Sequence, residues 1–233
     1  MNTFVIARRE LSTFFTSPLV YMIGAVFLLA TGLVFFFSVI LHNIASLTQL
    51  FNVISIILLF LVPVLTMHLF SSEARSGTLE LLLTAPVRNS EVVVGKFLAA
   101  YLFFVIILTP TVSYLFILMY YGNPDLPVTF SGYLGVVLLG TMLISLGVLT
   151  SALFDNQIIA AILTAVLSLF FWLVGSLGTV IGGTTGFIIT YLSVQGHFTD
   201  FVLGLITTNN IVYFLSVTVG ILFITSHILQ VRR

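Results

Sequence analysis

The stretch SEARSGTLELLLTAP, residues 72–86, is a short charged segment in a chain that is otherwise strongly apolar. It contains two Glu and one Arg, followed by leucines at helical spacing, Leu79, Leu82 and Leu83. Gly77 disfavours continuation of the apolar run before it. Pro86 pushes Ala85 out of helical geometry. The pattern predicts a short helix of about two turns that lies between two membrane spans.

Composition around this segment indicates a membrane protein. The chain has 233 residues, of which 60% are hydrophobic and 6% charged, and its mean hydropathy is +1.27. Soluble domains carry about 25% charged residues, so lipid must be the main solvent here. Net charge is +0 and no basic patch occurs, which argues against a nucleic-acid partner. The absence of Cys excludes disulfides and thiolate metal sites.

Apolar runs long enough to cross a bilayer occur six times, since a spanning helix needs about 20 apolar residues. We predict an all-α, polytopic membrane protein that forms one domain over residues 1–233. The expected spans are Leu19–Leu41, Phe51–Phe70, Val92–Tyr120, Gly132–Leu153, Ile158–Ile181 and Ile211–Leu229.

Basic residues fix the expected orientation. In the six-span arrangement all seven Lys and Arg lie on one side of the membrane, namely Arg8, Arg9, Arg75, Arg88, Lys96, Arg232 and Arg233. The positive-inside rule makes this side the cytosol, so both termini and the 72–86 segment are expected there. No Asp or Glu falls at mid-membrane depth, which argues against an ion-coupled carrier.

Two further segments do not fit simple spans. In residues 1–18 one helical face is apolar and the other polar, which predicts an amphipathic interfacial helix on the cytosolic surface. The apolar face contains Phe4, Ala7, Leu11, Phe14 and Phe15, and the polar face contains Arg9, Ser12, Thr13 and Thr16. A plain polar leader is the alternative. Residues 182–210 are fairly apolar but have a polar centre, and each half is too short to cross. We expect two half-helices that enter the outer leaflet and return, or a helix that lies at the outer interface.

Residues with recognisable chemistry give no catalytic, cofactor or metal site. Gly95-Lys96 lacks the upstream glycines and the following Ser or Thr of a phosphate loop, so we do not expect this chain to hydrolyse ATP. The four His are scattered, which favours hydrogen-bonded or interfacial roles over metal binding.

Five stretches together resemble the type-2 ABC transporter permeases, and the likeness covers nearly the whole chain. They are the segment at 69–87, Gly95-Lys96, Arg9-Glu10-Leu11 with Thr16-Ser17-Pro18, Asp155-Asn156-Gln157, and Leu192-Ser193 with His197-Phe198. The chain is most similar to the branch that contains permeases of gliding motility and nitrous-oxide-reductase maturation. It departs from the pattern at Ser72 and Ala74, where the family often has Glu and Arg, and at Leu203, where it often has Arg.

This resemblance implies a partner and candidate coupling residues. In the family two permeases pair, either as a homodimer or with a similar chain, and bind two cytosolic ABC ATPases that carry the ATP and magnesium. The implied location is the bacterial cytoplasmic (inner) membrane. The helix around 72–86 would couple to the ATPase through Glu73, Arg75, Gly77, Thr78, Leu79, Glu80, Leu82 and Leu83. Glu73 and Glu80 are seven residues apart and share a face, so we expect them to be available to the partner. The alternative is an ordinary polar connector.

Small residues along the fifth predicted span suggest a second contact surface. They follow one stripe, formed by Ala160, Thr164, Ser168, Gly175, Gly178 and Gly182. Small residues let helices approach closely in lipid, so the stripe is a possible face for pairing with a second permease. Packing within the same subunit is the alternative.

The sequence thus favours the permease subunit of an ATP-driven transporter, with export of an unidentified substrate. The alternative is a membrane subunit that does not transport, but transmits ATPase motion to a machine outside the cytoplasm.

Overall fold

The computed structural model describes residues 2–41, 46–78 and 88–231, and every regular element within these ranges is a helix. Six helical segments are long and apolar enough to cross a membrane: Pro18–Val39, Thr48–Arg75, Asn89–Tyr121, Leu126–Leu153, Gln157–Gly178 and Thr208–Gln230. The predicted all-α, six-span architecture is therefore confirmed, and the chain is a multi-pass membrane protein.

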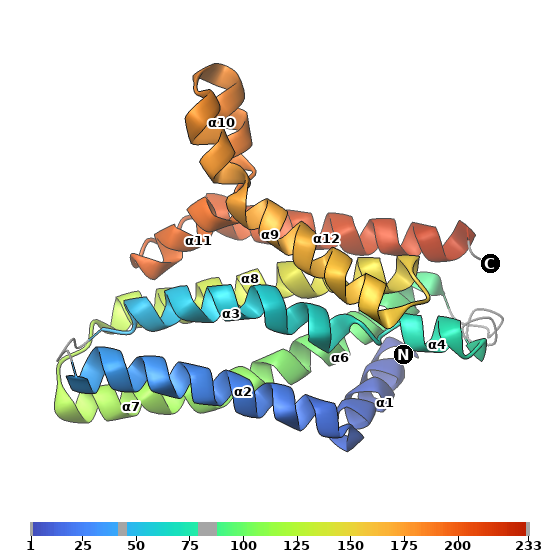
Figure 1. Cartoon of the computed structure of the whole chain (residues 1–233), viewed down its shortest axis with the longest axis horizontal. Coiled ribbons are helices and arrows are strands. Elements are labelled where there is room, and N and C mark those ends of the chain that lie inside the picture. Colours follow the sequence, from blue (N-terminus) through green and yellow to red (C-terminus); the bar gives the residue numbers. More distant parts are fainter. Residues whose placement is uncertain (1, 42–45, 79–87, 232–233) are drawn as a thin grey trace.

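Several spans are built from more than one element (Figure 1). Span one combines α2 (Pro18–Phe35) with the π-helical η1 (Phe36–Leu41), and span two combines α3 (Thr48–Thr66) with α4 (Ser71–Arg75). Span three contains α6 (Asn89–Leu108), η2 (Thr109–Thr111) and α7 (Val112–Tyr121). The last three spans are α8 (Leu126–Leu153), α9 (Gln157–Ile181) and α12 (Thr208–Val231). Outside the spans lie α1 (Asn2–Thr16), α10 (Gly183–Tyr191) and α11 (Val194–Val202).

Helix α8 forms the centre of the bundle and packs against α3, α6, α9, α11 and α12. Three of its glycines each lie against a phenylalanine from a neighbouring helix, at a distance that leaves no room for a Cβ on the glycine. The pairs are Gly132 with Phe51, Gly135 with Phe201 and Gly140 with Phe104. Close approach at small residues is the usual basis of helix association in lipid. A displacement of α8 would therefore reach most of the bundle.

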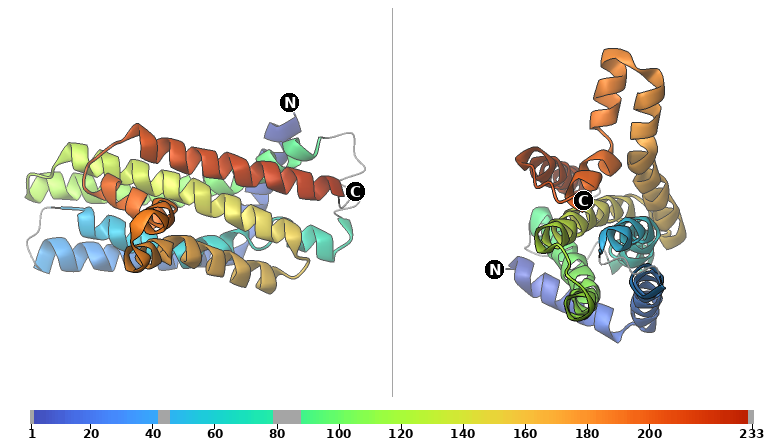
Figure 2. Two further views of the ribbon diagram at one scale, coloured as in Figure 1. Left: turned by 90° about the horizontal axis from the view of Figure 1, so that it is seen from above. Right: turned by 90° about the vertical axis from the view of Figure 1, so that its left-hand side faces the viewer.

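Both termini and α4 lie at the same end of the bundle (Figure 1). Helix α1 crosses this end at a steep angle to the spans, as the end-on view of Figure 2 shows. Its helical conformation fits the predicted amphipathic helix at 1–18, whereas its position at a membrane surface stays a prediction. At the same end Gly77 has φ of 71°, a left-handed conformation that ends the helical run after α4, as its sequence position predicts.

The predicted pair of short helices between spans five and six is present as α10 and α11. Gly182 and Gly183, with φ of 66° and 65°, turn the chain so that α10 folds back along the end of α9. The end of α9 and helix α10 form a hairpin that protrudes sideways from the bundle (Figures 1 and 2). We call it the α9–α10 hairpin. Whether residues 182–210 enter the outer leaflet and return, or lie at the outer interface, stays a prediction.

Candidate functional site

A buried lysine joins three separate parts of the chain at the α4 end of the bundle. Lys96, on α6, exposes only 1% of its side chain. Its Nζ lies 3.0 Å from Glu10 Oε1 on α1 and 3.0 Å from Glu73 Oε1 on α4, and it also donates to the carbonyl oxygen of Leu69. A buried ammonium needs such partners for all three of its N–H groups. We call these groups the Lys96 cluster.

The residue before this lysine lets α1 approach. A Cβ on Gly95 would lie 2.9 Å from Ile6 Cγ2 and 3.0 Å from the carbonyl oxygen of Thr3, so α1 rests directly on the backbone of α6. Glycine at 95 and lysine at 96 therefore work together, because the first permits the contact and the second binds Glu10 across it. The contact explains in structural terms why glycine and lysine are adjacent at this position.

Helix α4 is also fastened to the end of α8. Ser151 Oγ accepts hydrogen bonds from the backbone N–H groups of Phe70 and Ser71, at 2.9 and 3.1 Å. Ser71 Oγ donates to the carbonyl oxygen of Phe154, at 2.7 Å, in the loop between α8 and α9. Ser71 and Ser151 are both buried. The five residues of α4 thus connect to α1 and α6 on one side and to α8 and the following loop on the other.

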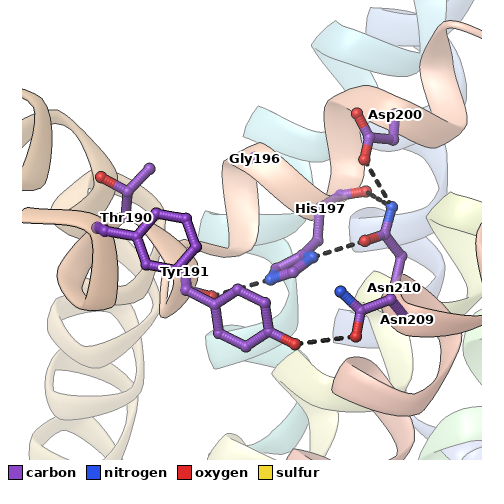
Figure 3. Close-up of a pocket in the computed structure, with 8 residues that line it drawn as sticks. Thr190, Tyr191, Gly196, His197, Asp200, Asn209 and Asn210 are labelled. Carbon is purple, nitrogen blue, oxygen red and sulfur yellow. Dashed lines mark hydrogen bonds between the residues drawn. The ribbon is translucent and has the colours of Figure 1, made fainter. Parts of the chain in front are cut away.

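At the opposite end of the bundle, a pocket of about 370 Å³ lies among α10, α11 and α12 (Figure 3). Its polar groups bind mainly to one another. His197 Nδ1 lies 2.7 Å from Asn210 Oδ1, and His197 Nε2 lies 2.9 Å from the carbonyl oxygen of Tyr191. Asn210 Nδ2 donates to Asp200 Oδ2 at 2.8 Å, and the Tyr191 hydroxyl donates to Asn209 Oδ1 at 3.0 Å. His197 is thus hydrogen-bonded, as its isolation in the sequence predicts.

Two oxygen atoms from different helices face the ring of His197. One is the carbonyl oxygen of Tyr191, which ends α10. The other belongs to Asn210 of α12, whose amide is oriented by its donation to Asp200. The network therefore fixes the position of the ring between α10 and α12.

The comparison with protein families agrees with this arrangement of spans and connecting helices. A family model described as ABC-2 family transporter protein matches residues 4–232. The chain belongs to this family. It is therefore the membrane-spanning permease of an ABC transporter. A search of curated proteins found no match.

The predicted coupling residues of the permease fall into two groups. Arg75, Gly77 and Thr78 are exposed at the end of α4. Glu73 differs from expectation, because 80% of its side chain is buried and it binds Lys96 rather than facing outward. The prediction that it is available to a partner is corrected, since a buried ammonium requires it. Leu79, Glu80, Leu82 and Leu83 lie outside the described residues, and their role stays a prediction.

The small-residue stripe on α9 faces its own chain. Ala160, Thr164 and Ser168 are buried, and Thr164 hydrogen-bonds to Thr150 of α8. Further along, Gly175 lies against Ser193.

The end of the same stripe contacts α10. A Cβ on Gly178 would lie 2.7 Å from the carbonyl oxygen of Gly186. Gly182 ends α9 at the turn of the hairpin. Most of the stripe therefore packs within the same subunit, which fits the alternative reading, whereas Gly182 is exposed. Whether the six residues also form a pairing face for a second permease stays a prediction.

Sequence reasoning missed the role of Lys96 as the buried residue that joins α1, α4 and α6. The sequence analysis used Lys96 as a topology signal and as part of the Gly95-Lys96 pair, and it used Glu10 as part of a family pattern, but it did not connect the two residues. A usable signal was present in the composition, since a chain with 6% charged residues rarely places Lys inside an apolar helix. Such a lysine needs a carboxylate from another segment at the same end.

Proposed function

We propose that the permease is driven by a separate cytosolic ABC ATPase, which binds at the α4 end of the bundle and acts on the 72–86 segment. The observation that carries the proposal is the double attachment of α4, to Lys96 through Glu73 and to Ser151 through Ser71. A force on the segment beyond Gly77 would reach α1 and α6 by the first attachment. It would reach the central helix α8 by the second.

Partner and location follow from the family resemblance. The permease pairs with a second copy or a similar chain, and two ATPases supply ATP hydrolysis and bind the magnesium. The complex lies in a bacterial cytoplasmic membrane with both termini in the cytosol, and it exports its substrate. We further propose that the permease belongs to the branch that its sequence resembles, which contains the permeases of gliding motility and nitrous-oxide-reductase maturation.

Coupling is tested by charge reversal at Glu80, because Glu73 is committed to the Lys96 cluster. Reversing a charge in an interface costs several kcal/mol, so Glu80→Lys is expected to lower ATPase recovery with the tagged permease by about tenfold or more. The measurement is quantitative mass spectrometry of an ATPase recognised by its phosphate-loop motif. Asp125→Lys, the same change in an exposed residue at the other end, is the control. Equal recovery for both variants would contradict the assignment.

Topology is tested by cysteine labelling, which is clean because the chain has no Cys. Ser76 and Asn123 are both exposed. Ser76 directly follows α4, and Asn123 lies between α7 and α8, which join at the opposite end of the bundle (Figure 1). In intact cells an impermeant thiol reagent is expected to label Asn123→Cys and not Ser76→Cys. After lysis both should react. Labelling of Ser76→Cys in intact cells would place the α4 end outside.

A second candidate function keeps the same coupling but moves no substrate, and drives an extracytoplasmic machine instead. The α9–α10 hairpin favours it, because the hairpin protrudes from the bundle and exposes Val180 (85%) and Phe187 (72%). Purified complex in liposomes distinguishes the two. ATPase stimulation by a small molecule would support transport, whereas stimulation only by a protein partner would support the second candidate.

A further inference from the structure

One face of helix α1 is not covered by the bundle on which the helix packs. Its inner face meets α6 through the buried Ala7 and Phe14 and through Ile6, which lies on Gly95. The helix crosses the end of the bundle instead of running along the spans (Figure 2). Its remaining surface is therefore presented at the level where the spans end.

An arginine interrupts the apolar edge of this free surface. Phe4, Arg8, Leu11 and Phe15 follow one another at steps of four, three and four residues, so they share one stripe of the helix. Phe4 is 74% exposed and Phe15 is 41% exposed, and Arg8 is exposed between them. Aromatic rings beside a long basic side chain are typical of helices at a membrane interface, where the rings enter the acyl region and the guanidinium stays at headgroup level.

The Lys96 cluster determines the charge of this surface. Glu10 is the only acidic residue of α1, and its carboxylate points inward to Lys96. Arg8 and Arg9 have no carboxylate within ion-pair distance among the residues that the structure describes. The exposed side of α1 is therefore purely basic, with two guanidinium groups beside aromatic rings.

We propose that α1 binds the headgroup of an anionic phospholipid, with Arg8 on the phosphate, Arg9 adding charge beside it, and Phe4 and Phe15 among the acyl chains. Guanidinium groups suit phosphate because their planar N–H groups can donate in pairs. The positive charge of this face is opposite to that of an anionic leaflet. Its apolar edge argues against a small soluble anion, which would leave the phenylalanine rings in water. An acidic surface of the ATPase is the competing occupant, which the experiment below separates.

Lipid selectivity of the purified permease tests the proposal without any ATPase, so its outcome is independent of the coupling assignment. Detergent-solubilised permease is titrated with phosphatidylglycerol or phosphatidylcholine, and bound lipid is counted by native mass spectrometry. The wild type should retain phosphatidylglycerol preferentially. Arg8→Gln should weaken this binding about fivefold, the effect expected for one basic residue at an anionic surface. Arg8→Lys should keep most of it, because the charge remains.

The matched control is Arg75→Gln, which removes an exposed arginine from α4 at the same end of the bundle and should leave lipid retention unchanged. Equal retention of the two lipids by the wild type would overturn the proposal. So would an equal loss for Arg75→Gln and Arg8→Gln. Unchanged lipid retention in Arg8→Gln, with reduced ATPase recovery, would also overturn it and assign the basic face to the ATPase.

Discussion

Lys96→Met is expected to destabilise the folded permease by about 3–5 kcal/mol, because it leaves Glu10 and Glu73 mostly buried without their shared cation. Methionine fills much of the same space, so the loss reports the charge rather than a cavity. The free energy of unfolding in detergent, measured by denaturant titration, checks the size of the effect. Faster proteolysis of α1 should accompany it, since Glu10 connects this helix to α6.

Two controls distinguish the effect of breaking the Lys96 cluster from nonspecific destabilisation of the permease. Arg88→Met removes an exposed basic residue at the start of the same helix and should change stability by no more than about 0.5 kcal/mol. Adding Glu10→Gln and Glu73→Gln to Lys96→Met removes the uncompensated carboxylates and should restore part of the lost stability. If the free energy of unfolding of Lys96→Met equals that of the wild type, the ion pairs among the three side chains do not stabilise the fold.

Gly178→Leu is expected to open the α9–α10 hairpin. A Cβ at this position would meet backbone atoms, the carbonyl oxygen of Gly186 and the amide nitrogen of Thr190, both at 2.7 Å. A rotamer change cannot relieve an overlap with backbone, so the two helices must separate. Overpacking typically costs about 1–3 kcal/mol, and we expect the upper part of this range. Hydrogen exchange of the α10 amides should become faster.

Leu177→Ile is the matched control, because Leu177 is the adjacent residue and 57% of it is exposed. It should leave the exchange of α10 unchanged. The same pair of variants also tests the predicted pairing face. Lower dimer recovery for Gly178→Leu with unchanged hydrogen exchange would argue that the stripe meets a second chain after all.

Local sequence properties were sufficient for the spans. Each span is a long apolar run, and hydropathy reports burial in lipid without knowledge of any partner. The turn at Gly182 and Gly183 and the helix break at Gly77 depend on a local property that can be read from the sequence. Glycine adopts a positive φ without the steric cost that other residues have. These features depend on a few neighbouring residues, so the sequence alone could place them.

Contacts between residues far apart in the chain could not be predicted from the sequence in the same way. Glu73 binds Lys96, and Lys96 binds Glu10 across a separation of 86 residues, so no local pattern shows that the two acids share one cation. The stripe on α9 was located correctly, but spacing alone cannot say which helix fills it. Gly186 continues the series after Gly178 and Gly182, on the far side of the turn. In the structure Gly186 lies against Gly178, so these small residues permit the close contact within the hairpin.

The distance along the chain between Glu10 and Lys96 also sets an order for biosynthesis. Helix α1 is made first, but its partner residue is 86 positions later and follows two complete spans. At typical translation rates of 5–20 residues per second, about 4–17 s pass before Lys96 is made. During this interval the nascent chain carries α1 with its acidic residue unpaired, and assembly of this end of the bundle must wait for the third span to leave the ribosome.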